Sequence, residues 1–439
     1  MMQTIDLRGI QPTRAAFERL VPRPVVDVQV AMHVATELIE DVRARGADAL
    51  REQAQRFDGG APAAIRVPAD DIAAAVEGLP TDVREALEEA IARVREATAV
   101  QVPPAAETRI GPGATIVQRW QPVERAGLYV PGGKAVLASS VVMNAVPAQI
   151  AGVASVALAS PPQREFGGSV HPVILGAAGL LGIDEVYAMG GAGAIGALAW
   201  GVEEIGLDPV QVITGPGNIY VAAAKRVVRG KTGIDSEAGT TEILVIADEA
   251  ADARFVAADL VSQAEHDEAA ASLLVTDSPA FAERVVAELE GLVAPTRHSD
   301  RVRTALGGPQ SAIVLVDDLT AAAAFSNAYG PEHLEIQTAD PDTVLADIQN
   351  AGAIFVGPSA PVSLGDYLAG SNHVLPTGGQ ARFSPGLGAY SFLRPQQVIR
   401  YDRDALREVA DRIVALSSAE DLPAHGAAVT IRFDDGEDA

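Results

Sequence analysis

Leu, Val and Ile recur every three or four residues between about Val26 and Gln101, with acidic residues and arginines between them. Ile91, Val94 and Val100 illustrate the apolar positions. A repeat near 3.6 residues is typical of amphipathic helices. This stretch is therefore expected to be mostly helical.

The middle of the chain holds four short apolar runs, and in three of them the apolar residues lead into glycine. They read GLYVPGG, VASVALAS, DEVYAMGG and VQVITGPGN, and segments of helical length separate them. Short buried runs alternating with helices are typical of a parallel sheet. The uncharged stretch from Ala135 to Gln163 could span a bilayer by length, but Pro147 and Gly152 interrupt it, which favours a buried helix followed by a buried strand.

A second alternating series follows and predicts a second α/β lobe. Its expected strands are EILVIAD, ASLLVTD, SAIVLVDD and AGAIFVG, and its expected helices are FVAADLVSQAEH, AFAERVVAELEGL and DTVLADIQN. After Pro395 we expect one amphipathic helix around Asp404 to Leu416, then a loop and a short strand AVTIRF before the acidic end. So small a tail is expected to pack on something else.

Composition narrows the function. The 439 residues contain no cysteine, which excludes thiolate metal sites and covalent thiol chemistry. The formal net charge of −25 would repel nucleic acid and anionic membranes, and Asp6 and Arg8 fall where a signal peptide needs its apolar core. A cytoplasmic enzyme is the expectation.

Two glycine loops resemble phosphate-binding motifs. Gly191, Gly193 and Gly196 match G-x-G-x-x-G, but no acidic residue closes the next strand, so we favour coincidence over a standard dinucleotide fingerprint. GLYVPGGKA departs from a P-loop in its spacing and has Ala135 where Ser or Thr would reach magnesium.

Four pairs of polar residues could carry chemistry. His33, His171 and His298 are interpreted as ordinary surface or structural histidines. The candidate pairs are Gln263 with His266, which share a helix face; Glu332 with His333, which open the apparent strand HLEIQ; Asp366 with His373 in a loop; and Glu420 with His425 in the tail. Each pair alone is weak evidence.

Taken together, the motifs YVPGG, GPGN, AKR, GID, SQAEH, GPEHL and GDYLAGSNHVLPTGG, with the tail Glu420 to His425, resemble histidinol dehydrogenase over nearly the whole chain. The resemblance implies oxidation of L-histidinol to L-histidinaldehyde and then L-histidine, the closing steps of histidine biosynthesis. Two NAD molecules would be consumed per turnover, with one Zn²⁺ per subunit.

The resemblance also implies roles for individual residues. Zinc ligands would be Gln263, His266, Asp366 and His425. The catalytic pair would be Glu332 and His333. Substrate contacts would be Thr241, Gln263, His266, His333, Asp366, His373, Glu420 and His425, and cofactor contacts would be Tyr129, Gly193 and Asn218.

The implied architecture is an α/β homodimer with exchanged tails, in which Glu420 and His425 complete the partner's site. Each chain would have two Rossmann-like lobes with incomplete parallel sheets and small terminal extensions. Its expected divisions are an N-terminal arm, residues 1–25; a discontinuous lobe, residues 26–125 and 240–388, carrying most zinc and catalytic residues; an NAD-facing lobe, residues 126–239; and a dimerisation tail, residues 389–439.

Two departures from the family pattern keep alternatives open. Gly193 stands where the family usually has a glutamine, and Thr240 stands where it has a proline beside the hydroxyl of Thr241. A relative acting on another polar alcohol is one alternative. A zinc- or imidazole-binding protein that has lost dehydrogenase activity is the other.

Overall fold

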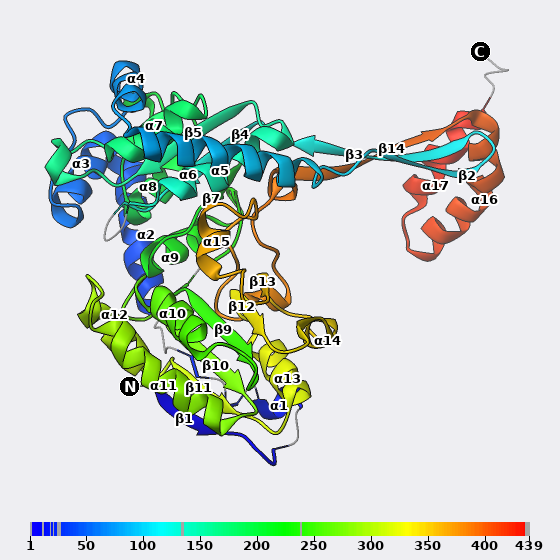
Figure 1. Cartoon of the computed structure of the whole chain (residues 1–439). Helices are drawn as coiled ribbons and strands as arrows, with labels where there is room; N and C mark the ends of the chain where they lie inside the picture. The colour runs from blue at the N-terminus through cyan, green and yellow to red at the C-terminus, as the bar shows by residue number, and fades with distance from the viewer. Residues whose placement is uncertain are drawn as a thin grey trace. The chain divides into compact units, whose positions relative to one another are not determined.

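The computed structural model describes residues 2–10, 13–17, 19–20, 22–23, 28–132, 136–237 and 239–434. The chain forms two compact units (Figure 1). The first comprises Met1–Gln101 with Val123–Phe392, and the second Val102–Pro122 with Leu393–Ala439. Gly133 and Ala135, on which the P-loop comparison depends, lie outside the described residues, as does Ala238.

The first unit contains a five-stranded parallel sheet in the order β6-β5-β4-β7-β8. Its strands are β4 (Arg125–Tyr129), β5 (Ser155–Ser160), β6 (Val186–Ala188), β7 (Val212–Thr214) and β8 (Gly233–Ile234). The helices between them are α6 (Ala138–Ala151), α7 (Pro172–Leu180), α8 (Gly191–Trp200) and α9 (Ile219–Val228). All four strands predicted from this region are confirmed, and α6 followed by β5 confirms the buried helix and strand predicted for the uncharged stretch.

Four N-terminal helices confirm the helical prediction for residues 26–101. They are α2 (Val28–Arg45), α3 (Ala47–Phe57), α4 (Ala69–Glu77) and α5 (Thr81–Ala99). They pack on the helices of this five-stranded sheet, with α2 on α8 and α9, α4 on α7 and α5 on α6. Ile39, Val42 and Leu50 of these helices complete the core of the five-stranded sheet. The expected grouping of residues 26–125 with residues 240–388 in one lobe stays a prediction.

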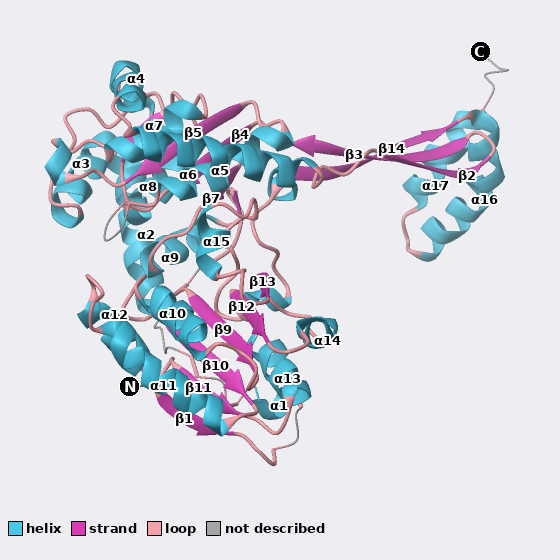
Figure 2. Ribbon diagram, in the orientation of Figure 1, coloured by secondary structure: helices cyan, strands magenta, loops and turns pink. Residues whose placement is uncertain are grey.

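A six-stranded parallel sheet, in the order β1-β11-β10-β9-β12-β13, forms the rest of the first unit (Figure 2). Its strands are β1 (Gln3–Asp6), β9 (Glu242–Ala247), β10 (Ala271–Thr276), β11 (Ala312–Leu315), β12 (His333–Gln337) and β13 (Ala353–Val356). Its helices are α1 (Arg14–Phe17), α10 (Ala253–Ala264), α11 (Pro279–Val293), α12 (Ser299–Gly307), α13 (Leu319–Tyr329), α14 (Pro341–Ala346) and α15 (Val362–Tyr367).

Helices cover both faces of this sheet. Ile243 and Val245 of β9 pack with α10, α11 and α12, whereas Leu244 and Ile246 pack with α1, α13 and α14. Burial of alternate residues on opposite faces explains the continuous apolar runs seen in the sequence. The second α/β series is thus confirmed, and β1 adds an edge strand that the sequence pattern did not predict.

The second unit is an antiparallel sheet with two helices. The sheet order is β14-β3-β2, with β2 (Ala106–Gly111), β3 (Ala114–Pro122) and β14 (Leu393–Tyr401), and the helices are α16 (Arg403–Ala419) and α17 (Pro423–Thr430). The α16 helix confirms the predicted tail helix. The strand predicted at AVTIRF is wrong, because this segment continues α17 into a 3₁₀ turn and packs along α16, where the guanidinium of Arg407 lies 4.3 Å from the ring centre of Phe433.

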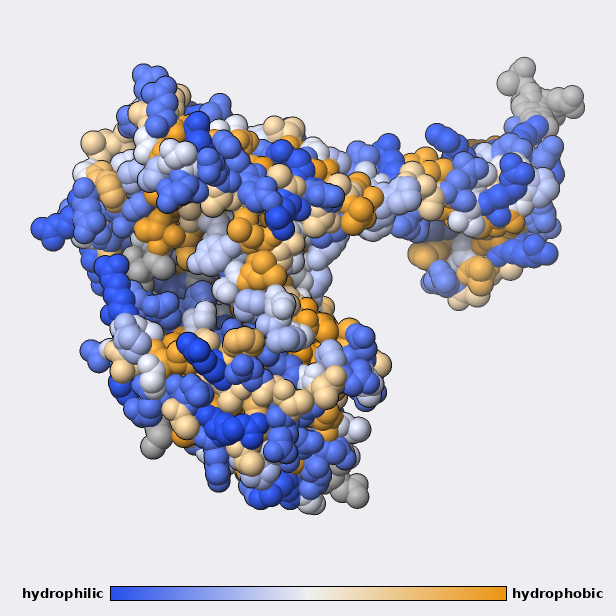
Figure 3. All heavy atoms as spheres, in the orientation of Figure 1, coloured by the Kyte–Doolittle hydropathy of each residue, from blue (hydrophilic) through white to orange (hydrophobic). Residues whose placement is uncertain are grey.

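Short 3₁₀ helices complete the described elements, at Arg164–Phe166, Glu203–Ile205, Gln380–Arg382, Ala389–Phe392 and Ile431–Phe433. Within the described ranges, no helix combines the length and apolar character needed to cross a bilayer. Hydrophilic residues cover most of the visible face in Figure 3, as the excess of acidic residues leads one to expect.

Candidate active site

Most of the candidate residues gather at the amino ends of the central strands of the six-stranded sheet. Thr241 leads into β9, Glu332 leads into β12, and His333 opens β12 opposite Ile243. The strand order reverses between these two strands. Open α/β sheets commonly bind ligands at their carboxyl ends, so a site at the amino ends departs from the usual arrangement.

Glu332 is a buried carboxyl group with two donors on one oxygen. Its Oε2 accepts from the Thr241 hydroxyl at 2.6 Å and from the Glu242 backbone N–H at 2.9 Å. Burial raises the pKa of Glu332 to about 8, although both hydrogen bonds act to lower it. A carboxyl group with this pKa is a stronger base than an exposed one and can exchange a proton near neutrality.

Gln263 is oriented by the same hydroxyl. It lies in the last turn of α10, and its Nε2 donates to Thr241 Oγ1 at 2.7 Å. Its Oε1 is buried and has no hydrogen-bond partner among the described residues. A buried amide oxygen left without a donor fits a position next to a cation.

The ring of His333 is held in one orientation. Its Nδ1 lies 3.1 Å from the backbone carbonyl of Glu242, which can only accept, so Nδ1 carries the proton and Nε2 has the lone pair. Nε2 is buried without a partner among the described residues. Burial lowers the pKa of His333. The ring is therefore a neutral imidazole with an unoccupied basic nitrogen.

Asp366, at the end of α15, lies near two further histidines, His373 and His266. His373 Nδ1 lies 3.0 Å from the Asp366 backbone carbonyl and 3.9 Å from its carboxylate, and His373 Nε2 lies 2.9 Å from the Ser140 hydroxyl at the start of α6. Burial lowers the pKa of His266, and Asp366 is near enough to oppose this shift. His266 follows α10, two residues after its last residue, Ala264.

The sequence did not identify Glu242 and its partners, which hold the candidate site in place. Glu242 Oε2 accepts from Arg23 at 3.0 Å and from the Tyr329 hydroxyl at 3.0 Å, and Glu242 Oε1 accepts from the Gly378 N–H at 3.1 Å. Burial raises the pKa of Glu242 to about 7. The sequence signal that could have identified it is a charged residue, Glu242, at the start of the otherwise apolar strand β9.

Three of the four expected metal ligands lie in the first unit. Gln263, His266 and Asp366 offer oxygen and nitrogen donors that suit zinc. No three His, Cys, Asp or Glu side chains within the described ranges form a metal-binding group. Glu420 caps α16 and His425 lies on α17, both in the second unit and both exposed. The residues present fit zinc as an incomplete set of ligands.

The expected cofactor residues lie at the carboxyl edge of the five-stranded sheet. Tyr129 ends β4, and its hydroxyl accepts from the Gly191 N–H at 3.1 Å. Asn218 Oδ1 caps α9 by accepting from the N–H groups of Tyr220 at 3.0 Å and Val221 at 3.2 Å. The side chain of Asn218 is exposed, and its amide nitrogen is chemically suited to donate to a ligand.

The glycine-rich start of α8 does not offer a standard pyrophosphate site. The Gly191 N–H already bonds Tyr129, and a Cβ built on Gly190 would lie 3.2 Å from the carboxylate of Asp58. A carboxylate there opposes a phosphate. Gly193 faces α3, because a Cβ built on it would lie 2.1 Å from Oε1 of Gln53.

Near Thr240, the backbone N–H of Gly239 donates to the Thr377 hydroxyl at 2.5 Å. This contact anchors the loop in which the resemblance to the family leads one to expect a proline.

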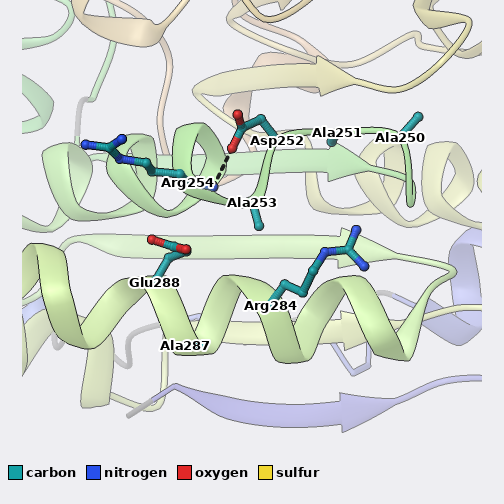
Figure 4. A pocket seen from close by; sticks show the side chains of 8 residues that line it. All are labelled: Ala250, Ala251, Asp252, Ala253, Arg254, Arg284, Ala287 and Glu288. Atoms are coloured by element: carbon teal, nitrogen blue, oxygen red, sulfur yellow. Dashed lines mark hydrogen bonds between the residues drawn. The ribbon is translucent and has the colours of Figure 1, made fainter.

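A surface depression elsewhere on the six-stranded sheet is a poor candidate. Ala250 to Arg254 line it with Arg284, Ala287 and Glu288, and Asp252, one of its two carboxylates, is occupied in capping α10 (Figure 4). It lies at the start of α10, about 15 Å of helix from Gln263.

Comparisons with known proteins agree with the motifs. Residues 21–433 match the sequence model of the family described as Histidinol dehydrogenase. A histidinol dehydrogenase of Leifsonia xyli subsp. xyli is 84% identical over 434 residues, covering 99% of this chain and 100% of the relative. One of Thermobifida fusca is 58% identical over 433 residues, covering 99% and 98%. The crystal structure of histidinol dehydrogenase from Elizabethkingia anophelis matches with a TM-score of 0.91 at 33% identity and 98% coverage of each chain.

Proposed function

The chain belongs to the histidinol dehydrogenase family, and on that premise we propose that it oxidises L-histidinol to L-histidine through L-histidinaldehyde, using zinc and two NAD molecules. These are the closing steps of histidine biosynthesis. The observation that carries the proposal is a pair of buried acceptors at the amino edge of the six-stranded sheet, Gln263 Oε1 and His333 Nε2, for which the described part of the chain supplies no hydrogen-bond partner. The Gln263 oxygen is suited to bind a cation, and the His333 nitrogen is suited to accept a proton.

Gln263, His266 and Asp366 would hold the zinc, together with His425 of the partner subunit. Zinc bound there would supply positive charge that orients the substrate's polar groups. Thr241 fixes the Gln263 amide so that its oxygen remains available. Asp366 and Glu420 supply negative charge suited to a cationic amino alcohol.

In the first oxidation, His333 Nε2 accepts the hydroxyl proton of histidinol while hydride leaves the carbinol carbon for NAD. The Glu242 carbonyl holds the proton on Nδ1, which keeps the lone pair on Nε2. Burial favours the neutral ring that this step needs.

In the second oxidation, water adds to the aldehyde and a second hydride leaves for the second NAD. Glu332 takes the proton of the attacking water, because its raised pKa strengthens it as a base. The chain has no cysteine, so no thiohemiacetal forms on the enzyme. The carboxylic acid that forms then loses its proton, so the products are the carboxylate of histidine, NADH and two protons, one of which Glu332 takes first.

The test is NADH formation by the full-length, zinc-loaded protein with L-histidinol as the only alcohol. Turnover with histidinol, and at least about tenfold lower kcat/KM with a polar alcohol lacking the imidazole, supports the proposal. Preference for another alcohol would point to a relative with a different substrate. Histidinol binding without NAD reduction would point to a binding protein that has lost dehydrogenase activity.

A further inference from the structure

A buried ion pair lies at the carboxyl edge of the five-stranded sheet. Lys225 of α9 is 1% exposed and Asp235, which follows β8, is 4% exposed, and the ammonium contacts the carboxylate directly. Neither residue belongs to the catalytic or zinc-binding set. Burying two charges carries a large desolvation cost, so what the pair holds in place matters.

The pair holds both polar groups of one glycine. Asp235 Oδ2 accepts from the Gly215 N–H at 2.9 Å, and Lys225 Nζ donates to the Gly215 carbonyl at 2.9 Å. A carboxylate on the N–H and an ammonium on the carbonyl fix the orientation of both peptide planes around Gly215. Charge-assisted hydrogen bonds of this kind are about twice as strong as neutral ones.

Gly215 needs such restraint because its backbone is unusual. Its φ is +120°, and a Cβ built on it would lie 1.9 Å from the carbonyl oxygen of Tyr129. Only glycine allows the end of β7 to approach the end of β4 this closely. Gly215 also begins the turn that leads to Asn218, the cap of α9.

We infer that Lys225 and Asp235 are positioning residues for NAD, because they hold Gly215 and so set the turn that carries Asn218 beside the end of β4. The inference rests on the proposed function, in which Tyr129 and Asn218 contact NAD. Neither Lys225 nor Asp235 touches the cofactor. They act by keeping the binding surface in one conformation before NAD arrives.

A second buried ion pair, at the amino ends of the strands of the same sheet, serves as a matched control. Arg125 opens β4, Glu185 precedes β6, and their side chains pair at 2.7 Å with exposures of 12% and 20%. This pair is also largely buried, but it lies at the amino ends of the strands. Removing it should lower stability without altering the turn at Gly215.

The experiment compares Lys225→Met/Asp235→Asn with Arg125→Met/Glu185→Gln in the full-length, zinc-loaded protein. Each double variant removes both charges, because a single change would leave one charge buried and unpaired. The readouts are the Kd of NAD from calorimetric titration, the KM values for NAD and histidinol, the zinc content and the melting temperature.

We expect the Lys225/Asp235 variant to raise the Kd and KM of NAD about tenfold or more, with zinc content and histidinol KM within about twofold of wild type. The Arg125/Glu185 variant should melt earlier and keep wild-type NAD affinity. Equal loss of NAD affinity in both variants, or none in a folded Lys225/Asp235 variant, would overturn the inference.

Asp235→Glu provides a second variant that preserves the charge balance and so the fold, but displaces the carboxylate by one methylene. It should raise the Kd of NAD about threefold, and an unchanged Kd would again overturn the inference. A wild-type protein that binds NAD but does not oxidise histidinol would refute the proposed function while the titrations still decide the role of the pair. A wild-type protein that binds no NAD would refute both.

Discussion

At the scale of single residues, the site depends on which atoms are left without partners. The Glu242 carbonyl accepts a hydrogen bond from Nδ1–H of His333, and the Thr241 hydroxyl accepts one from the amide N–H of Gln263. What remains is a basic nitrogen and an acceptor oxygen. Motif resemblance could name these residues, but it could not show the supporting contacts, because Glu242, Ser140 and Thr377 come from distant parts of the chain.

Replacing His333 with Asn removes the proton acceptor while keeping a polar side chain of similar bulk. Oxidation of histidinol should fall by about 10²–10⁴ in kcat, the usual contribution of a general base. Bound zinc, measured by metal analysis, should be unchanged. The exposed His33→Asn serves as the control, and a His333→Asn protein with wild-type kcat would contradict the assigned role.

Replacing Thr241 with Val removes the hydroxyl that links Gln263 to Glu332 and keeps the side-chain shape. A buried donor and a buried carboxylate would each lose a partner, so kcat/KM for histidinol should fall about tenfold or more. Thr241→Ser keeps the hydroxyl and should retain most activity. Equal kinetics in the two variants would show that the link has no catalytic effect.

At the scale of elements, buried hydrogen bonds join three of the elements that carry the candidate site, α10, β12 and α15. Glu335 of β12 and Asp259 of α10 hydrogen-bond to each other. Gln337 donates to Glu335 at 3.0 Å and to Asp259 at 3.2 Å. The N–H of Val362, which opens α15, donates to Glu335 at 3.0 Å. These elements carry Gln263, His333 and Asp366. Two adjacent buried carboxyls must share a proton to coexist.

This carboxyl pair predicts a pH-dependent stability. Burial raises the pKa of Glu335 from its ordinary value of 4.5 to about 8, so its proton stabilises the fold fully below about pH 4.5, and that stabilisation is lost as pH rises through about 8. The melting temperature of wild type should therefore fall between pH 6 and pH 9. Glu335→Gln should fall less steeply, whereas the exposed Glu96→Gln should follow wild type; parallel curves for all three would contradict this account.

The elements also show how far the sequence could predict the fold. The strands of both parallel sheets are buried on two faces and so appear as continuous apolar runs, as in β9 and β10. The strands β2 and β14 are largely exposed, so hydrophobic pattern gave no signal for them. The β-branched residues of the final segment AVTIRF favour a strand, but the segment is helical because it packs on α16.

At the scale of the whole molecule, the ligand set is divided between two compact units. Gln263, His266 and Asp366 belong to the first, and Glu420 and His425 belong to the second. The family resemblance predicts that the second unit serves the partner's site in a homodimer. The sequence could indicate this division only through motifs, because hydrophobic pattern carries no information about which copy supplies a residue.

Mixing two inactive variants tests the crossed arrangement. His333→Asn lacks the base and His425→Asn lacks the tail ligand, so each alone should be nearly inactive. If tails cross, half of the randomly reassociated dimers hold one intact site, and the mixture should regain about a quarter of wild-type activity. If each tail serves its own chain, the mixture should stay inactive after reassociation.

The most direct test of the central claim is the number of NADH molecules formed from each histidinol. With zinc-loaded protein, limiting L-histidinol and excess NAD, absorbance at completion should correspond to two NADH per histidinol, with histidine as the product. One NADH per histidinol with accumulating aldehyde, or no NADH at all, would contradict the account.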